Sequence, residues 1–217
     1  MDILRYLLFA LCGFALGGVL FSYHLPKLLK GVDVCAVSQD HNPGTANAFK
    51  HAGIPVGVLC LLCDLSKGFV PVFWAMRSLD PQSPWFALVI AAPALGHAVA
   101  PLYHHRGGKC IAATFGALLG LLPISYLVFE LAALYLFFSL VWIIRPNERR
   151  TVVVFTLFSA LTVLGAARTG RWSFAFGAML LSLTVIAKNL QDAKLEAHAK
   201  LLRQAQADEP EVGEQHP

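Results

Sequence analysis

Charged residues are scarce in this sequence. They make up 14% of its 217 residues, whereas hydrophobic residues make up 57%, and the mean hydropathy is +0.62. A soluble globular protein of this length needs more polar surface than these residues can supply, so the composition excludes that class of protein. It predicts instead an all-α, polytopic integral membrane protein whose apolar solvent is the lipid bilayer.

The sequence has no run of basic residues with interleaved aromatic residues, although its net charge is +4. The basic residues lie between apolar stretches, so we expect no nucleic-acid partner. A disulfide framework is also missing, because the five cysteines are odd in number and lie mostly within apolar runs. Cys60 and Cys63 have a metal-like spacing without a second pair, and we interpret them as small packing residues.

Three other absences bear on architecture. No internal repeat is visible, so a transporter made of two inverted halves has little support. The apolar runs alternate too weakly with polar residues to indicate a β-barrel. Residues 1–22 show no convincing cleavage site before a polar start, so they are interpreted as the first transmembrane helix.

The apolar runs that are present predict about seven transmembrane helices. A crossing needs about 20 apolar residues, so the longest run is divided at Leu122-Pro123. The predicted helices are 3–23, 53–75, 85–104, 110–122, 125–144, 152–167 and 172–187.

Basic residues are distributed unequally between the two predicted sides. The segments 24–52, 105–109, 145–151 and the C-terminal tail together contain twelve of the 17 Lys and Arg residues. The positive-inside rule therefore predicts an external N-terminus and a cytoplasmic C-terminus. Residues 1–190 are expected to form the membrane domain, and 191–217 a short cytoplasmic helix followed by a disordered acidic tail.

Asp64 and Lys67 lie three residues apart in the second predicted span, on one face of the helix. Ionised groups inside a membrane are expensive unless they are paired or face a polar cavity. Two interpretations follow: a structural pair that fixes helix packing, or a pair presented to a polar ligand near the cytoplasmic end.

Gly107-Gly108-Lys109 precedes the fourth predicted helix. The glycines allow the backbone to approach an anion closely. The start of the helix offers unpaired N–H groups and the positive end of the helix dipole. Phosphate binding is one hypothesis, and a tight turn with a positive membrane anchor is the other. His97 is interpreted either as a packed histidine or as a group that handles a proton or phosphate, whereas a metal site with His104 and His105 lacks a further ligand.

Taken in order, three blocks resemble the bacterial acyl-phosphate-dependent glycerol-3-phosphate acyltransferase family. The resemblance runs from about Gly17 to Gly116, and the family has seven transmembrane helices with an external N-terminus. The blocks are Asn42-x-Gly44-x-x-Asn47-x-x-Lys50, Asp64-x-x-Lys67-Gly68-x-x-Pro71-Val72, and Gly96-His97 with Gly107-Gly108-Lys109 and Thr114.

The resemblance implies acyl transfer from acyl phosphate to glycerol 3-phosphate or a related polyol phosphate, giving lysophosphatidate and phosphate. It implies no metal or nucleotide cofactor, and it places the protein in the bacterial inner membrane with a site facing the cytoplasm. The implied catalytic residues are His97, Asn42 and Asn47. The implied substrate-binding residues are Gly44, Lys50, Asp64, Lys67, Gly68, Gly107, Gly108, Lys109, Thr114 and Ser159.

The chain departs from the family pattern at several positions. The family's Gly-Ser-x-Pro is Gly17-Gly18-Val19-Leu20 here, its Gly-Ser-Gly-Asn is Gln39-Asp40-His41-Asn42, and an Arg is Lys50. Cys110 stands for a glycine after Gly-Gly-Lys, Ser159 is what is left of a Ser-rich motif, and Lys188-Asn189-Leu190 only echoes a His-x-x-Asn-Ile motif. Two alternatives to the enzyme therefore stay open: a non-catalytic or regulatory homologue that binds a phosphorylated lipid or polyol, and a small transporter.

Overall fold

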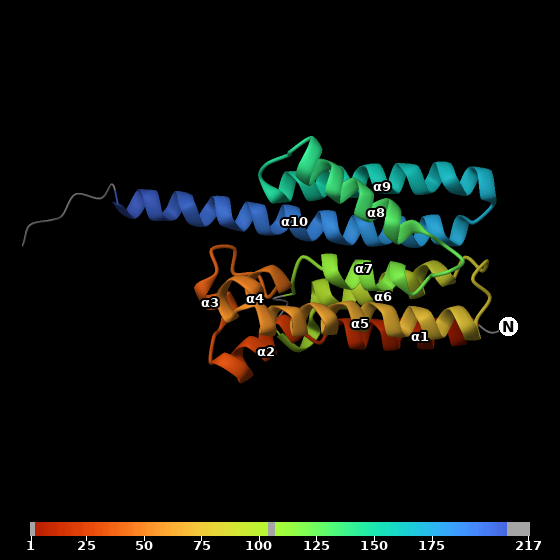
Figure 1. Ribbon diagram of the computed structural model, residues 1–217, viewed down its shortest axis with the longest axis horizontal. Helices are drawn as coiled ribbons and strands as arrows, with labels where there is room; N and C mark the ends of the chain where they lie inside the picture. Colours follow the sequence, from red (N-terminus) through yellow and green to blue (C-terminus); the bar gives the residue numbers. More distant parts are fainter. Residues whose placement is uncertain (1–2, 104–106, 208–217) are drawn as a thin grey trace, which may run out of the picture.

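The computed structural model describes residues 3–103 and 107–207, which form helices and connecting turns (Figure 1). Long helices run back and forth along one axis, and short helices collect at one end. In chain order the α-helices are α1 (Ile3–Gly17), α2 (Phe21–Lys30), α3 (Val34–Val37), α4 (Thr45–Ala52), α5 (Ile54–Ser78), α6 (Phe86–Val99), α7 (Ile111–Leu119), α8 (Leu127–Leu136), α9 (Asn147–Thr169) and α10 (Trp172–Ala207). A 3₁₀ turn (Pro101–Tyr103) follows α6, and a π-helical turn (Phe137–Val141) continues α8.

Among the described residues, five helical segments are long and apolar enough to cross a membrane. The predicted runs 110–122 and 125–144 are also helical, but α7 has nine residues and Leu127–Val141 has 15. At 1.5 Å per residue these are about 14 and 22 Å long, shorter than a hydrocarbon core of about 30 Å. The helical class is thus confirmed, and the count of seven crossings stays a prediction. The five segments are Ile3–Lys30, Ile54–Ser78, Phe86–Tyr103, Asn147–Thr169 and Trp172–Leu195.

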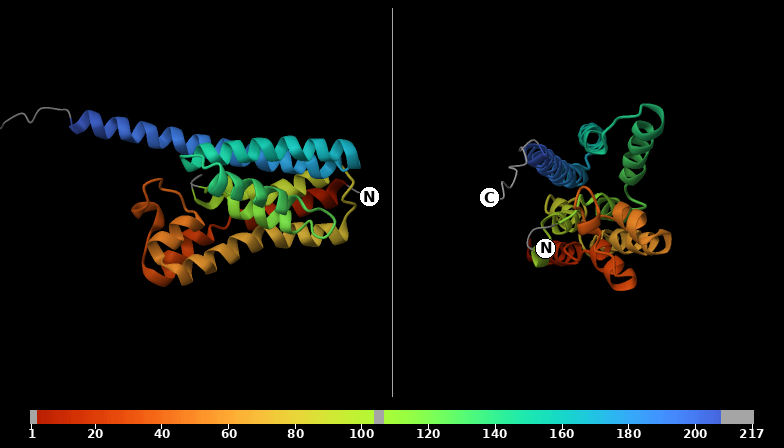
Figure 2. Two further views of the ribbon diagram at one scale, coloured as in Figure 1. Left: turned by 45° about the horizontal axis from the view of Figure 1, so that its top comes forward. Right: turned by 90° about the vertical axis from the view of Figure 1, so that its left-hand side faces the viewer.

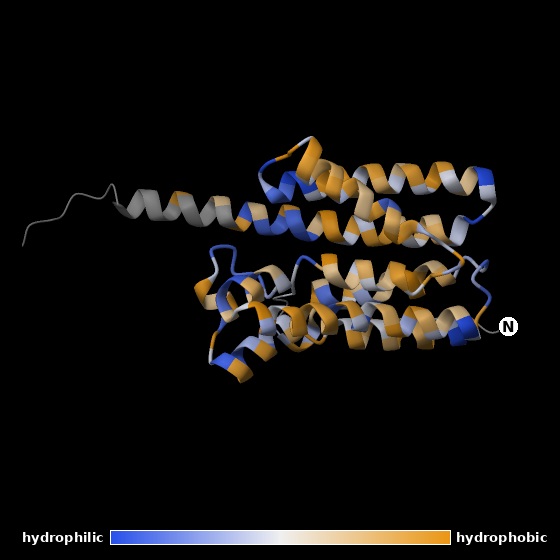
Figure 3. Cartoon of the chain, in the orientation of Figure 1, coloured by the Kyte–Doolittle hydropathy of each residue, from blue (hydrophilic) through white to orange (hydrophobic). Residues whose placement is uncertain are grey.

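The connection between the first two predicted spans is itself helical. Residues 24–52 lie between the first two predicted helices, and the structure has α2, α3 and α4 there, with α4 packed against α5. Asp33 caps α3 by accepting hydrogen bonds from two backbone N–H groups, which explains how so short a helix begins in this segment. Figure 3 shows hydrophilic residues collected at this end of the bundle.

The last helix differs from the expected domain boundary. α10 continues without a break from Trp172 to Ala207, so the surface helix expected after residue 190 extends the final membrane segment. α10 packs on α9 and α6 (Figure 2). Residues 208–217, the predicted disordered tail, lie outside the described residues.

Glycines permit two close helix contacts. A Cβ at Gly68 would overlap the carbonyl oxygen of Ala113, and one at Gly116 would overlap that of Leu65, so α5 and α7 touch along their backbones. α1 and α6 meet in the same way, through Gly17 and Gly96. Small residues are the usual means by which membrane helices approach closely. These contacts fix α5 and α6, which carry Lys67 and His97.

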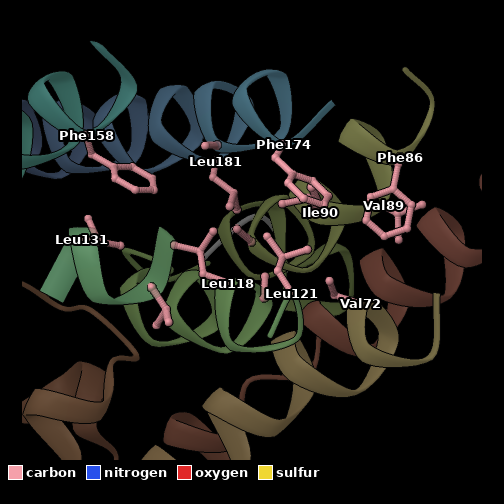
Figure 4. Close-up of a cluster of buried hydrophobic side chains, with 14 of the residues drawn as sticks. Val72, Phe86, Val89, Ile90, Leu118, Leu121, Leu131, Phe158, Phe174 and Leu181 are labelled. Atoms are coloured by element: carbon pink, nitrogen blue, oxygen red, sulfur yellow. The ribbon is translucent and has the colours of Figure 1, made fainter. Parts of the chain in front are cut away.

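The hydrophobic core joins helices from both halves of the chain (Figure 4). Phe86 of α6 and Phe174 of α10 meet edge to face with ring centroids 6.3 Å apart, and both are almost fully buried. Such a pair adds about 0.5–1.5 kcal/mol beyond the area it buries. The other labelled members are Val72, Val89, Ile90, Leu118, Leu121, Leu131, Phe158 and Leu181.

Candidate active site

A buried ion pair lies at the centre of the candidate site. Lys67 Nζ is 2.8 Å from Asp64 Oδ1, and the two residues are only 4% and 1% exposed. Their three-residue separation on α5 puts both side chains on one face of the helix, as the sequence predicts. Removal of either partner would leave an uncompensated buried charge, a change that typically destabilises proteins by about 3–5 kcal/mol.

Hydroxyl groups from two other elements hold Asp64. Ser22 Oγ, on α2, donates to Asp64 Oδ2, and Thr45 Oγ1, on α4, donates to the same oxygen at 3.1 Å. The carboxylate therefore ties the start of α2 and the start of α4 to α5. Neither hydroxyl was singled out from the sequence, because single Ser and Thr residues near helix starts are common and carry no distinctive spacing.

The ammonium group of Lys67 makes two hydrogen-bonding contacts in addition to its ion pair. Besides Asp64, it contacts the carbonyl oxygen of Val19 at 2.7 Å and Nδ1 of His97 at 2.6 Å. Asp64 Oδ1 itself is buried and has no hydrogen-bond partner in the described part of the chain, so its contact with Lys67 is electrostatic. Lys67 therefore contacts His97 directly, and the phosphate contact that the family resemblance implies for it stays a prediction.

The contact with Lys67 also fixes the tautomer of His97. If the paired ammonium donates to Nδ1, the proton of the neutral imidazole is on Nε2. Nε2 lies against Gly108, where a Cβ would overlap it, and the same Cβ would be 3.2 Å from Asn42 Oδ1. Asn42 Oδ1 is buried and has no hydrogen-bond partner in the described part of the chain. A donor and an unpaired acceptor therefore face the same glycine.

Lys109 lies in a second network at the same end of the bundle. Its Nζ is 3.0 Å from Asp40 Oδ2 and 3.0 Å from Glu148 Oε1, in the first turn of α9. Asn47 Nδ2 donates to Asp40 Oδ1 and to the carbonyl oxygen of Asn42, each at 2.8 Å. Asp40, which replaces a hydroxyl residue of the family pattern, is thus the link between the Asn42–Asn47 loop and Lys109.

These contacts keep the Lys109 network ionised around neutral pH. Partial burial opposes the charge of Asp40, but the hydrogen bonds from Asn47 and Lys109 outweigh it and lower the pKa of this carboxyl. Burial likewise opposes the charge of Lys109, but Glu148 and Asp40 raise the pKa of its ammonium. The stabilisation from Asp40 is therefore lost only as pH falls through its lowered folded pKa, and that from Lys109 only as pH rises through its raised one.

The Gly-Gly turn packs closely against the end of α6, and its predicted approach to an anion stays a prediction. A Cβ at Gly107 would overlap the carbonyl oxygens of His97 and Ala98. Cys110, which ends the turn and precedes α7, has a φ of +52° in the left-handed region that favours glycine. The turn therefore keeps a glycine-type backbone where this chain has a cysteine.

α10 adds polar residues that the sequence analysis did not place in the site. Lys188 and Asp192 form an ion pair of 3.3 Å, and Asn189 between them is 1% exposed. Electrostatic interactions reach from Lys188 to His97 and from Asp192 to Lys109. The sequence signal for Lys188 and Asn189 is the echo of a family motif noted above. Asp192 lies in a polar run that resembles an ordinary solvated helix face.

Four predicted site residues lie apart from these networks. Lys50 is exposed on α4, and Ser159 is half-buried in the middle of α9. Gly68 lies in the α5–α7 contact, and Thr114 on α7 is buried with no hydrogen-bond partner for its hydroxyl among the described residues. Gly44, by contrast, is the N-cap of α4 next to Asn42.

The metal alternative involves residues that cannot be placed. His104 and His105, like Arg106, lie outside the described residues. Within the described ranges, no group of three His, Cys, Asp or Glu side chains is arranged to hold a metal ion.

Comparisons with known proteins agree with the sequence resemblance. The family model described as glycerol-3-phosphate acyltransferase matches residues 7–195. A glycerol-3-phosphate acyltransferase of Halalkalibacterium halodurans is 32% identical over 174 residues, 80% of each chain. Glycerol-3-phosphate acyltransferase 2 of Thermotoga maritima is 40% identical over 124 residues, which are 57% of this chain and only 62% of the relative.

The fold is also similar to a solved structure. The crystal structure of PlsY (YgiH), an integral membrane glycerol 3-phosphate acyltransferase in its lysophosphatidic acid form, matches with a TM-score of 0.73 and 22% identity. The match covers 90% of this chain and 93% of that one. A glycerol 3-phosphate form of the same protein matches with the same TM-score.

Proposed function

This chain belongs to the glycerol-3-phosphate acyltransferase family, and we propose that it catalyses the reaction for which that family is named. The proposed reaction is transfer of a fatty acyl group from acyl phosphate to a hydroxyl of glycerol 3-phosphate. The hydroxyl oxygen attacks the acyl carbonyl carbon and forms the ester, while the bond from that carbon to the phosphate oxygen breaks. The leaving phosphate takes the bonding electrons, and the products are lysophosphatidate and inorganic phosphate.

The observation that carries the proposal is the convergence of His97 and Asn42 on Gly108. Asn42 Oδ1, buried and unpaired, can accept the hydrogen bond of the attacking hydroxyl. The Nε2–H of His97 can donate to the carbonyl oxygen as negative charge develops on it. Gly108 allows the two groups to lie this close to the backbone, since a Cβ at this position would overlap His97 Nε2.

His97 serves as a donor in this scheme, and not as the general base. Its Nδ1 accepts from Lys67, and its Nε2 already carries the proton, so it has no free lone pair for a second one. The proton of the attacking hydroxyl is therefore transferred to the leaving phosphate. Asp64, Ser22 and Thr45 act one step further away, because they fix Lys67 and thereby the orientation of the imidazole.

We further propose seven crossings, with this site at the cytoplasmic face of a bacterial inner membrane. The direction of the chain alternates along the bundle axis from α1 through α5, α6, α7, α8 and α9 to α10 (Figure 1). That alternation leads 24–52, 145–151 and the later part of α10 to one end of the bundle, where most basic residues of the sequence are found.

One observation favours a non-catalytic homologue that keeps the fold. Lys109 contacts two carboxylates and Lys67 contacts one, so the charge of each lysine is already largely balanced before a phosphate binds. A phosphate that binds Lys109 would lie close to Asp40 and Glu148, whose negative charges oppose it.

An assay of phosphate release separates the two functions. Purified protein is given acyl phosphate with glycerol 3-phosphate, with other polyol phosphates, or with no acceptor. The proposed enzyme releases phosphate only when an acceptor is present, and His97→Asn reduces that release. A non-catalytic homologue releases none with any acceptor, although it can still bind the polyol phosphate.

A further inference from the structure

A pocket with polar and apolar lining lies at the opposite end of the bundle from His97. It has a volume of about 160 Å³ and is lined by residues of α8, α9, the start of α10 and the turn before α8, elements that can be followed in Figure 1. Its polar lining includes Ser125, Glu130, Thr169 and Arg171. None of these residues belongs to the candidate active site, so the cavity requires an explanation of its own.

Glu130 is the residue that most needs a partner. It is an acid in the otherwise apolar α8, and its Oε1 is buried with no hydrogen-bond partner in the described part of the chain. An unpaired buried carboxylate oxygen is costly, and in a membrane segment such a group usually faces a polar pathway or ligand. The missing partner is therefore a hydrogen-bond donor that enters the cavity.

Arg171 supplies the opposite charge at the exposed rim of the same cavity. One of its guanidinium nitrogens donates to the carbonyl oxygen of Ile124, which ties the side chain to the turn before α8. A guanidinium group has five N–H donors, so others are available for an anion. The cavity thus has an acceptor inside and a cationic donor at its mouth, the arrangement that suits a zwitterion.

The surroundings place this mouth at the level of lipid headgroups. Tyr126 and Trp172 flank this end of α8 and α10 and are 65% and 44% exposed, as is typical of aromatic residues at a membrane surface. Leu161 and Leu164 continue along the outer face of α9 and are also exposed. A molecule bound here would have its polar end in the cavity and apolar chains along α9.

The size of the cavity limits what can enter. A volume of about 160 Å³ admits a small polar end group such as an aminoethyl group but not a long acyl chain. A primary ammonium group can donate to Glu130, whereas a trimethylated ammonium is bulkier and has no N–H. We propose that this cavity binds a phospholipid whose headgroup ends in a primary ammonium, with the ammonium on Glu130 and the phosphate on Arg171.

Phosphatidylethanolamine is the probe for this proposal, and phosphatidylcholine and phosphatidylglycerol are the controls. The full chain in nanodiscs of each composition is heated, and bound lipid is measured by native mass spectrometry. We expect phosphatidylethanolamine alone to raise the unfolding temperature and to stay bound. An equal response to phosphatidylcholine would overturn the proposal, and so would an equal response to free O-phosphoethanolamine, because that result would make the ligand a soluble metabolite.

Two variants test the site itself. Glu130→Gln should weaken phosphatidylethanolamine binding by about tenfold, because it removes a charge-assisted hydrogen bond. Gly165→Leu should abolish the specific response by filling the cavity, since Gly165 lines it and a Cβ there meets nothing within 4 Å. Ala160→Leu, on the exposed face of α9 away from the cavity, is the matched control and should bind like the unmodified protein. Unchanged binding in the first two variants would contradict the site, whatever the outcome of the acyl-transfer assay.

Discussion

At the scale of single residues, the position of one proton on His97 governs the proposed chemistry. Glutamine has its amide nitrogen near the position of Nε2, and asparagine has its oxygen near that of Nδ1. His97→Gln should therefore keep the donor that faces Gly108, whereas His97→Asn should keep only the contact with Lys67. We expect His97→Asn to lose roughly ten- to hundredfold in kcat/KM, and His97→Gln to lose clearly less. Equal losses in steady-state assays would contradict the assigned tautomer.

Lys109 can be tested in the same way against its two carboxylates. Lys109→Met leaves Asp40 and Glu148 without their shared cation, so stability and kcat/KM should both fall, the latter by about ten- to hundredfold. In the double variant Lys109→Met with Glu148→Gln, one of the two unpaired carboxylates is gone. Its thermal stability should therefore be higher than that of Lys109→Met alone. If Lys109 is a phosphate ligand, activity stays low in the double variant. Recovery of activity would make Lys109 a structural residue only.

Residues within motifs were easier to predict than their partners. The three-residue spacing of Asp64 and Lys67, and the Gly-Gly turn before a helix, are local signals that the sequence contains. Ser22, Thr45 and Glu148 reach the site from other elements, and no local pattern distinguishes them from ordinary helix-start residues. The contacts of Lys67 with Val19 and His97 could be learned only from the packing of α5 against its neighbours.

At the scale of elements, the turn that begins α7 makes a specific prediction. Cys110→Ala and Cys110→Gly both remove the buried thiol, but only glycine relieves the left-handed backbone at this position. The Gly variant should therefore be more stable than the Ala variant by about 1 kcal/mol, measured by thermal or denaturant unfolding. The same pair of changes at Ser159, in the middle of α9, is the control and should show the usual order, with Ala more stable than Gly. The usual order at Cys110 as well would contradict the strained turn.

Helix boundaries were predicted correctly where polar or turn-forming residues interrupt the apolar runs. The division at Leu122-Pro123 was placed correctly, since α7 ends at Leu119 and α8 begins at Leu127. The helices α2, α3 and α4 were missed, because they are short and amphipathic and depend on packing against α5. The length of α10 was missed too, because its polar second half resembles a separate surface helix.

At the scale of the whole molecule, the proposed topology puts Gln39 and Pro146 on one side of the membrane and Gln82 on the other. Single cysteines at these positions, in a chain whose five native cysteines are replaced, should react with an impermeant thiol reagent accordingly. We expect the first two to be labelled from the cytoplasmic side only, and the third from outside only. If the cysteines introduced at positions 39 and 82 were labelled from the same side, the chain would have a different number of crossings. That result would remove the basis for a cytoplasmic site.

The central claim is that this chain couples acyl phosphate to glycerol 3-phosphate at the site formed by His97, Asn42 and Gly108. The most direct test measures product in proteoliposomes supplied with acyl phosphate and ¹³C-labelled glycerol 3-phosphate. The account predicts labelled lysophosphatidate in equal amount to the phosphate released, with both products reduced in His97→Asn protein that is folded and inserted. Phosphate release without lysophosphatidate, or no reaction by well-folded unmodified protein, would contradict it.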